Sequence, residues 1–235
     1  MKKYNHRRWT DTENHLVLFM DIMGFKDRVV RKNHESLLHD FENFINNNER
    51  LKPLLNDGKG ELIRLALFSD SIILATIDAS KQSLNRIVKA ATVLMHNALE
   101  VGFPIKGAIS LGPVTFDNNK GIYFGQSIVD SYLLEEELKF YGIVFHHSVE
   151  LLIEEYLKNP PKRGRNSLYI PVEFKKISLK SGLSKHYTIA YHTLRRDLSR
   201  GDYRKNIEKW LSVICKSVSG SPRIYLDNTY SFLGI

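Results

Sequence analysis

Residues 16–25 read LVLFMDIMGF, and the fold is decided in this stretch. Apolar residues follow one another without alternation, which is typical of a central strand buried on both faces. Asp21 is the single charged residue in the run, and Gly24 ends it. An ionised carboxylate in such a strand needs compensation, because a buried unpaired charge is strongly destabilising. The run therefore predicts a central strand over residues 15–22 whose end presents a carboxylate.

Patterns on the C-terminal side of this run predict alternating strands and helices. Apolar residues recur at helical spacing in three segments, and short apolar runs bounded by turn residues predict further strands. The order is β-α-β-β-α-β-α-β, so we expect an α+β fold in which a mostly antiparallel sheet is covered by helices. Its first part has the ferredoxin-like connection, β-α-β-β-α-β. The predicted helices are 34–49, 83–101 and 126–140, and the predicted strands are 62–68, 72–76, 104–111 and 142–145.

The composition shifts after Tyr156. The Pro-rich and basic segment that follows predicts a surface loop, and beyond it we expect further elements added to the same sheet. We therefore expect a single domain over residues 1–235, with a core at about 14–156 and a C-terminal β/α elaboration at about 157–235. The C-terminal elements are predicted at 159–165 (loop), 169–174 and 186–192 (strands), 203–217 (helix) and 223–230 (extended segment).

Composition narrows the class of protein. With 43% hydrophobic and 26% charged residues, the 235-residue chain can build one substantial core. Cys215 is the only cysteine, which excludes an intrachain disulfide and a cysteine-based zinc site. No apolar run approaches the roughly 18–20 residues of a membrane span, so we expect a cytoplasmic protein without a membrane partner. The net charge of +8 suits an anionic partner, although many cytosolic proteins are basic without one.

Asp21 and Asp70 point most directly to chemistry. Asp70 lies at the tip of the predicted hairpin 62–76, so both carboxylates are expected on adjacent central strands. Mg²⁺ and Mn²⁺ prefer carboxylate oxygens, waters and substrate phosphates as ligands. Gly24, shortly after Asp21, would let backbone N–H groups approach a phosphate. The plain alternative is that Asp21 caps a helix near Met23 and that Asp70 is an ordinary turn residue.

Four motifs together resemble those of class III nucleotidyl cyclases. Residues 19–25 (FMDIMGF) resemble the first metal-binding motif of that family, and residues 68–71 (FSDS) fall where it carries a second metal-binding Asp. Residues 106–112 (KGAISLG) are similar to its later glycine-rich strand, and residues 122–135 are similar to its dimerisation helix. The resemblance covers about residues 16–144 and implies the cyclase version of the ferredoxin-like core.

Departures from the purine cyclases limit what the resemblance implies. The two positions that read the purine base in those enzymes are Ala66 and Ile122 here, which disfavours a purine cyclase. The Asn and Arg that the family usually carries in its dimerisation helix fall on Val129 and Leu133. By the purine-cyclase pattern, this enzyme would be impaired.

A subgroup of the family accommodates these replacements. Residues 125–135 (GQSIVDSYLLE) and 225–229 (YLDNT) are similar to the pyrimidine cyclases of bacterial Pycsar anti-phage systems. The resemblance implies conversion of UTP or CTP to cyclic UMP or cyclic CMP. It also implies a homodimer with shared active sites and a separate effector protein that senses the cyclic nucleotide, with no nucleic-acid partner.

The resemblance assigns roles to individual residues. Asp21 and Asp70, together with the Ile22 carbonyl, would hold two Mn²⁺ or Mg²⁺ ions per active site. Tyr132 is the candidate for the catalytic role of the missing helix Asn or Arg. Backbone N–H groups at the glycine turn would hold the β- and γ-phosphates, and they belong to Met23, Gly24 and Phe25.

Strand alternation puts Arg64 and Phe68 on the same side as Asp70. We expect Arg64 to donate to a pyrimidine oxygen and Phe68 to pack on the ring. The alternatives are a cross-strand salt bridge for Arg64 and an ordinary core position for Phe68. Because Arg64 can only donate, it suits the O4 acceptor of uracil and so favours UTP over CTP.

Two other functions stay open at this point. Val129 and Leu133 fit a catalytically inactive cyclase-homology domain that only dimerises. The basic balance fits a ferredoxin-like nucleic-acid-binding module, which would leave Asp21 without a role.

Overall fold

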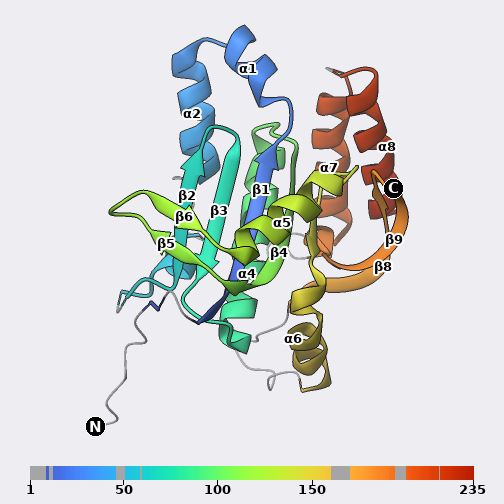
Figure 1. The fold of residues 1–235 in the computed structure, drawn as a ribbon. Helices are drawn as coiled ribbons and strands as arrows, with labels where there is room; N and C mark the ends of the chain where they lie inside the picture. The colour runs from blue at the N-terminus through green and yellow to red at the C-terminus, as the bar shows by residue number, and fades with distance from the viewer. Residues whose placement is uncertain are drawn as a thin grey trace.

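The computed structural model describes residues 9–10, 13–45, 51–58, 60–159, 170–193, 200–216 and 218–235. This part of the chain forms an α+β fold built on a seven-stranded sheet with the order β2-β3-β1-β4-β7-β9-β8 (Figure 1). Neighbouring strands are antiparallel except β4 and β7, which are parallel. The strands are β1 (Asn14–Ile22), β2 (Ile63–Phe68), β3 (Ser71–Thr76), β4 (Ile105–Pro113), β7 (Ile143–Phe145), β8 (Val172–Leu179) and β9 (Gly182–Ile189), with β5 (Thr115–Asp117) and β6 (Ile122–Phe124) paired separately.

β1 is the central strand that the sequence predicts. It pairs with β3 on one side and with β4 on the other. Leu16, Leu18 and Met20 point into the main core, whereas Val17 and Phe19 point to the opposite face, and all five are buried. Burial on both faces explains why this run shows no alternation. The order β2-β3-β1-β4 is compatible with the expected ferredoxin-like core.

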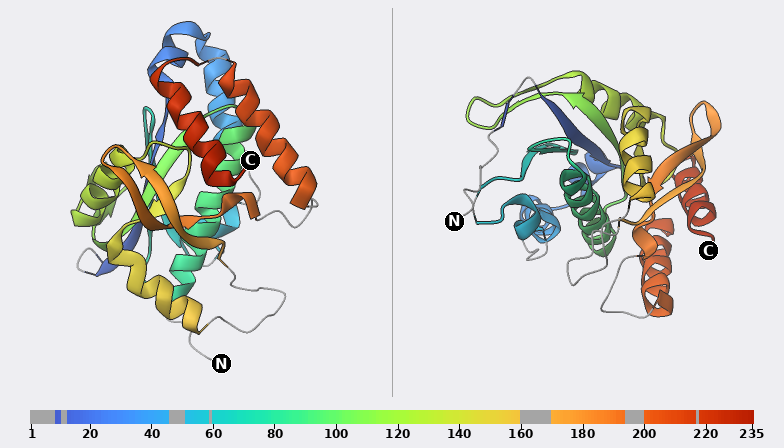
Figure 2. Two further views of the ribbon diagram at one scale, coloured as in Figure 1. Left: turned by 90° about the vertical axis from the view of Figure 1, so that its right-hand side faces the viewer. Right: turned by 90° about the horizontal axis from the view of Figure 1, so that it is seen from below.

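Helices cover both faces of the sheet. α2 (His34–Ile45) and α4 (Lys81–Glu100) lie on one face, and α5 (Gln126–Glu137) lies across β1 and β4 on the other (Figure 2). α4 presents a long buried stripe to the sheet, and the Ser80 side chain caps its first turn by accepting a hydrogen bond from the Ser83 backbone N–H. The other helices are α1 (Phe25–Arg31), α3 (Lys52–Leu55), α6 (His147–Lys158), α7 (Arg200–Cys215), α8 (Ser221–Leu233) and the short 3₁₀ turn η1 (Tyr191–Thr193).

Most elements of the predicted core are confirmed with shifted ends. α2 ends at Ile45, and the remainder of the predicted helix 34–49 lies outside the described residues. α5 ends at Glu137 rather than at residue 140, because Leu138 leaves the helix and forms a bridge with Leu179 of β8. Three helices, α1, α3 and α6, were not predicted. No helix in the described ranges is long and apolar enough to cross a bilayer.

The C-terminal part differs most from the prediction. The strands expected at 169–174 and 186–192 are shifted, because β8 and β9 form one hairpin that joins the sheet through β7. The helix expected at 203–217 is confirmed as α7. The extended segment expected at 223–230 is wrong, since these residues belong to α8. Of the predicted loop at 159–165, all but the first residue lies outside the described part.

α8 shows why the extended assignment failed. Leu226, Thr229 and Phe232 are buried at a spacing of three residues, which is one face of a helix. Pro222 lies in the first turn, where its missing N–H costs nothing, and Gly234 ends the helix with a positive φ of 69°. Between Pro222 and Gly234, polar and aromatic residues made the helical spacing of the buried residues hard to recognise in the sequence.

Gly107 has a packing role in β4. A Cβ atom at this position would lie 2.7 Å from the Phe19 carbonyl oxygen and 2.8 Å from Met20 Cγ. A Cβ at Gly112 on the same strand would make an ordinary contact with Ser127, 3.5 Å away. The first glycine of the strand is therefore required where β4 lies against β1, and the second is not.

We expect Gly107→Ala to destabilise the protein by about 2–3 kcal/mol, because backbone atoms of the central strand would have to move. Gly112→Ala is the matched control and should change stability by less than about 1 kcal/mol. Urea unfolding followed by circular dichroism measures both values. Equal losses in the two variants would contradict this account of β4.

Candidate active site

Asp21 and Asp70 meet at one end of the sheet, as the sequence predicts. Asp21 lies opposite Ser71 in the β1–β3 ladder, and Asp70 directly precedes Ser71 in the β2–β3 turn. The Ile22 backbone N–H donates to the Asp70 carbonyl oxygen at 2.9 Å, which ties the turn to the end of β1. Asp21 is an ordinary part of the strand and caps no helix, because α1 begins only at Phe25.

Burial of the Asp21 carboxyl raises its pKa from 3.8 to about 6, and the nearby charge of Asp70 adds to this shift. The positive charge of Lys106 opposes it, and Glu136 reinforces it. A carboxylate whose ionisation is disfavoured by burial and by a neighbouring carboxylate would be favoured in its charged form by a bound cation. The pair thus fits a divalent cation on electrostatic grounds.

Two carboxylates suit a cation whose remaining ligands are waters and substrate phosphates. Among the described residues, no group of three or more His, Cys, Asp or Glu side chains is arranged to hold a metal. Mg²⁺ is usually bound through one or two carboxylates, with waters and substrate phosphates completing its shell. Asp21 and Asp70 match that pattern, and they do not match a closed structural site.

The strand register arranges the surroundings of Asp21 in rows on the α5 face of the sheet. Phe68, Ser71, Asp21 and Lys106 share the first row across β2, β3, β1 and β4. The second row contains Ala66, Ile73, Phe19 and Ala108, and the third contains Arg64, Ala75, Val17 and Ser110. Phe68 is therefore level with Asp21, whereas Arg64 is two rows away.

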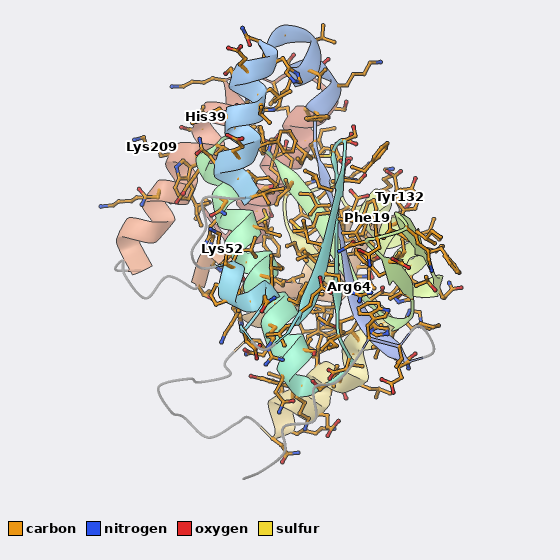
Figure 3. The ribbon with its side chains drawn as sticks, turned by 90° about the vertical axis from the view of Figure 1, so that its left-hand side faces the viewer. Phe19, His39, Lys52, Arg64, Tyr132 and Lys209 are labelled. Carbon is orange, nitrogen blue, oxygen red and sulfur yellow. The ribbon has the colours of Figure 1, made fainter. Side chains whose placement is uncertain are left out.

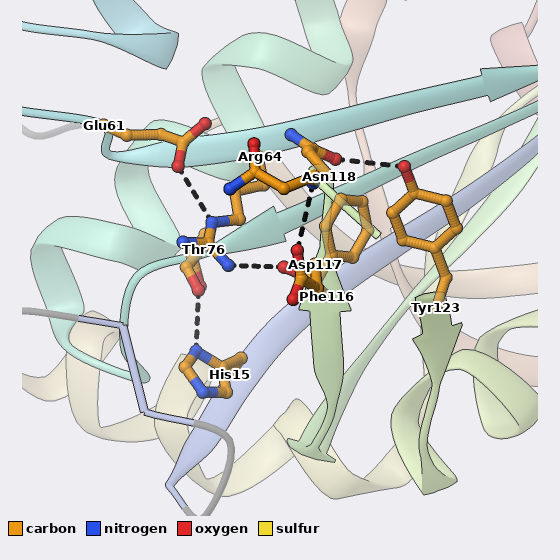
Figure 4. Close-up of polar contacts among 9 residues, drawn as sticks. His15, Glu61, Arg64, Thr76, Phe116, Asp117, Asn118 and Tyr123 are labelled. Carbon is orange, nitrogen blue, oxygen red and sulfur yellow. Dashed lines mark hydrogen bonds and ion pairs between the residues drawn. The ribbon is translucent and has the colours of Figure 1, made fainter. Parts of the chain in front are cut away.

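The structure does not bring Arg64 to the carboxylate pair. Its Nε donates to Glu61 at 2.8 Å, and a second nitrogen donates to the Phe116 carbonyl oxygen (Figure 4). Its guanidinium lies 4.3 Å from the ring centre of Trp9. A hollow of about 480 Å³ opens at this end, lined by Arg64 with Trp9, Glu61 and the loop 117–119. Strand alternation gave the correct face for Arg64 but the wrong height along the strand. Arg64 forms a salt bridge, although with Glu61 three residues earlier and not across strands as the alternative had it.

Tyr132 and Phe68 both lie close to the first row. The Tyr132 ring packs edge-on against Phe19, with centroids 5.4 Å apart, and Phe19 precedes Asp21 by two residues on the same face (Figure 3). Phe68 is 83% exposed at the hairpin tip and so is no core residue. Both rings are available to a ligand at Asp21.

The glycine turn contributes fewer free donors than expected. Gly24 has a φ of 70°, a conformation that favours glycine, and α1 starts directly after it without a side-chain cap. The Met23 N–H donates to the Pro104 carbonyl oxygen at 2.8 Å, so it is already used within the fold. Phe25 packs its ring against Phe41. Of the three predicted N–H groups, those of Gly24 and Phe25 stay candidates for phosphate.

Sequence reasoning missed a buried ion pair beside Asp21. Lys106 Nζ lies 2.9 Å from Glu135 Oε1, and the two side chains are 4% and 1% exposed. Burial raises the pKa of Glu135 to about 7, although Lys106 opposes the shift. The signal in the sequence is the spacing Ser127, Ser131, Glu135, which places three polar residues on the buried face of α5.

Seven exposed apolar residues lie on the α5 side of the sheet and form what we call the apolar patch, of which Phe68 and Tyr132 lie nearest to the carboxylate pair. They come from the β2–β3 hairpin tip, from β6 and from the outer face of α5. They are Leu67, Phe68, Ile122, Phe124, Val129, Tyr132 and Leu133. Scattered single apolar residues are normal on a surface, but a gathering of this kind marks an interaction site.

Asp21→Asn should stabilise the protein at pH 7 by about 1 kcal/mol when no divalent cation is present. The pKa of Asp21 is higher in the folded chain than in the unfolded chain, so its ionisation costs stability as the pH rises from about 4 towards 7. The advantage of the Asn variant should vanish near pH 4. Urea midpoints at the two pH values test this, with the exposed Asp227→Asn of α8 as control. An equal advantage at both pH values would contradict the assignment.

Comparison with known proteins leaves the function to be argued from this geometry. No protein-family model matches the chain, and no curated protein matches it.

Proposed function

We propose that this chain is a class III nucleotidyl cyclase that converts a pyrimidine nucleoside triphosphate to its 3′,5′-cyclic monophosphate. The product would serve as a second messenger in anti-phage defence, sensed by a separate effector protein. The observation that carries the proposal is the meeting of Asp21 and Asp70 at one strand end, where burial and mutual repulsion raise the pKa of Asp21. The ferredoxin-like order of the first four strands supports it.

The reaction forms a bond from the ribose O3′ to the α-phosphorus and breaks the bond to the leaving pyrophosphate. Two Mg²⁺ or Mn²⁺ ions, when bound, would supply activation of the 3′-hydroxyl and neutralise the leaving group. Asp21 and Asp70, with the Ile22 carbonyl, would hold these ions. The tie between the Ile22 N–H and the Asp70 carbonyl fixes the two acidic residues relative to each other.

Substrate contacts follow from the residues nearest to the pair. The N–H groups of Gly24 and Phe25 would bind the phosphates, and the exposed Phe68 ring would pack on the pyrimidine. Tyr132 would orient the ribose or the reacting phosphate from its position against Phe19. Because Arg64 is engaged two rows away, the preference for UTP over CTP loses its support, and both are candidate substrates.

A homodimer would bury the apolar patch. The patch borders the carboxylate pair, so a second copy seated on it would close the open side of the site and exclude water. Active sites shared between two copies would then follow from the position of the patch. One observation favours the second candidate function, an inactive dimerisation domain: Val129 and Leu133 present only apolar groups from the outer face of α5.

Incubation of the purified protein with Mn²⁺ and each of UTP, CTP, ATP and GTP should yield a cyclic pyrimidine nucleotide by mass spectrometry. Asp21→Asn and Asp70→Asn should each lower the rate at least about 100-fold, since each removes a cation ligand. Asp227→Asn is the matched control and should retain the rate. Absence of product with every triphosphate, despite dimer formation, would favour the inactive domain.

Val129→Glu should convert the dimer to a monomer, because a charge would be placed in the centre of the apolar patch. Sedimentation velocity measures the oligomeric state, and the cyclase rate should fall with it. Leu151→Glu is the control, since Leu151 is 81% exposed on α6 and outside the patch. A wild-type protein that sediments as a monomer at all concentrations would contradict the shared site.

A further inference from the structure

The buried pair of Lys106 and Glu135 lies in an unusual position. Lys and Glu are almost never fully buried unless they are paired, and here both are removed from solvent. The Lys106 ammonium contacts two oxygens of the same residue, the Glu135 carboxylate at 2.9 Å and the Glu135 backbone carbonyl at 3.0 Å. Both contacts have the length of charge-assisted hydrogen bonds, and the carboxylate contact is also a buried ion pair.

Lys106 is also the direct cross-strand neighbour of Asp21. The two residues oppose each other in the β1–β4 ladder and point to the same face of the sheet. Side chains at such positions start about 4.5–5.5 Å apart, and opposite charges there normally pair. Both residues are described by the structure, yet no ion pair joins them, and the ammonium turns to α5 instead.

Two features of α5 account for this choice. Glu135 places its carboxylate 2.9 Å from the ammonium, in a site from which water is excluded. Its carbonyl lies in the last turn of α5, where it accepts the Leu138 N–H as well as the ammonium and lies at the negative end of the helix dipole. Together they hold the ammonium on the side of the helix.

We propose that Glu135 is a positioning residue that acts through Lys106, holding its ammonium away from Asp21 so that the Asp21 carboxylate stays open to a divalent cation. Without Glu135, the ammonium would be released next to an acidic neighbour within its reach. An ammonium on Asp21 would occupy the carboxylate oxygens and repel an incoming cation. The inference rests on the metal site of the proposed function and adds a residue that controls access to it.

The test is direct Mn²⁺ binding, measured from the electron paramagnetic resonance signal of free Mn²⁺ without any substrate. Glu135→Gln should weaken Mn²⁺ binding about tenfold or more, because the ammonium moves to Asp21. Lys106→Met should bind Mn²⁺ no more weakly than the wild type. The double variant Lys106→Met with Glu135→Gln should restore the affinity, since no ammonium is left to be released.

Restoration by a second substitution separates this role from a structural one. If the pair only held α5 in place, the double variant would bind Mn²⁺ as weakly as Glu135→Gln, and that result would overturn the inference. Glu137→Gln is the matched control, because it removes the same charge two residues later, from a side chain that accepts from the Ser181 N–H, and should change the affinity by less than about threefold.

Further outcomes are equally decisive. Unchanged Mn²⁺ affinity in a folded Glu135→Gln protein overturns this inference and leaves the proposed function standing, whereas a wild type that binds no Mn²⁺ overturns both. Circular dichroism reports whether each variant folds. Should Glu135→Gln fail to fold, the neutral double variant decides, since replacing both charges together is far milder than breaking a buried pair. Weaker Mn²⁺ binding in that variant than in the wild type contradicts the inference.

Discussion

β1 is hydrogen-bonded on both sides and buried on both faces, and the rest of the structure depends on that constraint. Its pairing with β3 and β4 fixes the order of the core strands, and its two faces determine where α4 and α5 pack. A strand so enclosed has one place for a charged group, which is its end. Asp21 lies there, and the Ile22 N–H at the same end holds the turn that carries Asp70.

The charged residues at the site differ in how well the fold compensates their charges. The positive charge of Lys106 is compensated by Glu135 at the end of α5, whereas the Asp21 and Asp70 carboxylates lie near each other with little compensating positive charge. This local excess of negative charge is the basis for the cation site that we propose. The proposed homodimer would bury the apolar patch, part of which lies next to these carboxylates.

The features that the sequence predicted correctly depend on residues close together in the chain. The continuous apolar run identified β1, and the hairpin tip put Asp70 beside it, because adjacent strands bring their ends together. Arg64 was assigned to the correct face but to the wrong level, since alternation carries no information on the distance along a strand. The Lys106–Glu135 pair joins residues from separate elements, so its contact depends on how α5 docks and not on any local pattern. The helical period of α8 was hidden by polar residues on its buried face, such as Thr229.

The buried face of α5 is small and polar, with Ser127, Ser131 and Glu135 in line. The Ser127 hydroxyl donates to Pro113 and the Ser131 hydroxyl to the Ser127 carbonyl, so hydrogen bonds and the one ion pair replace much of the apolar contact that holds α4. Hydrophobic contacts weaken on cooling because burial of apolar surface lowers the heat capacity, whereas burial of polar surface changes the heat capacity in the opposite direction. The attachment of α5 should therefore weaken less on cooling than that of α4, so the helix that carries Tyr132 and Glu135 keeps its place at low temperature.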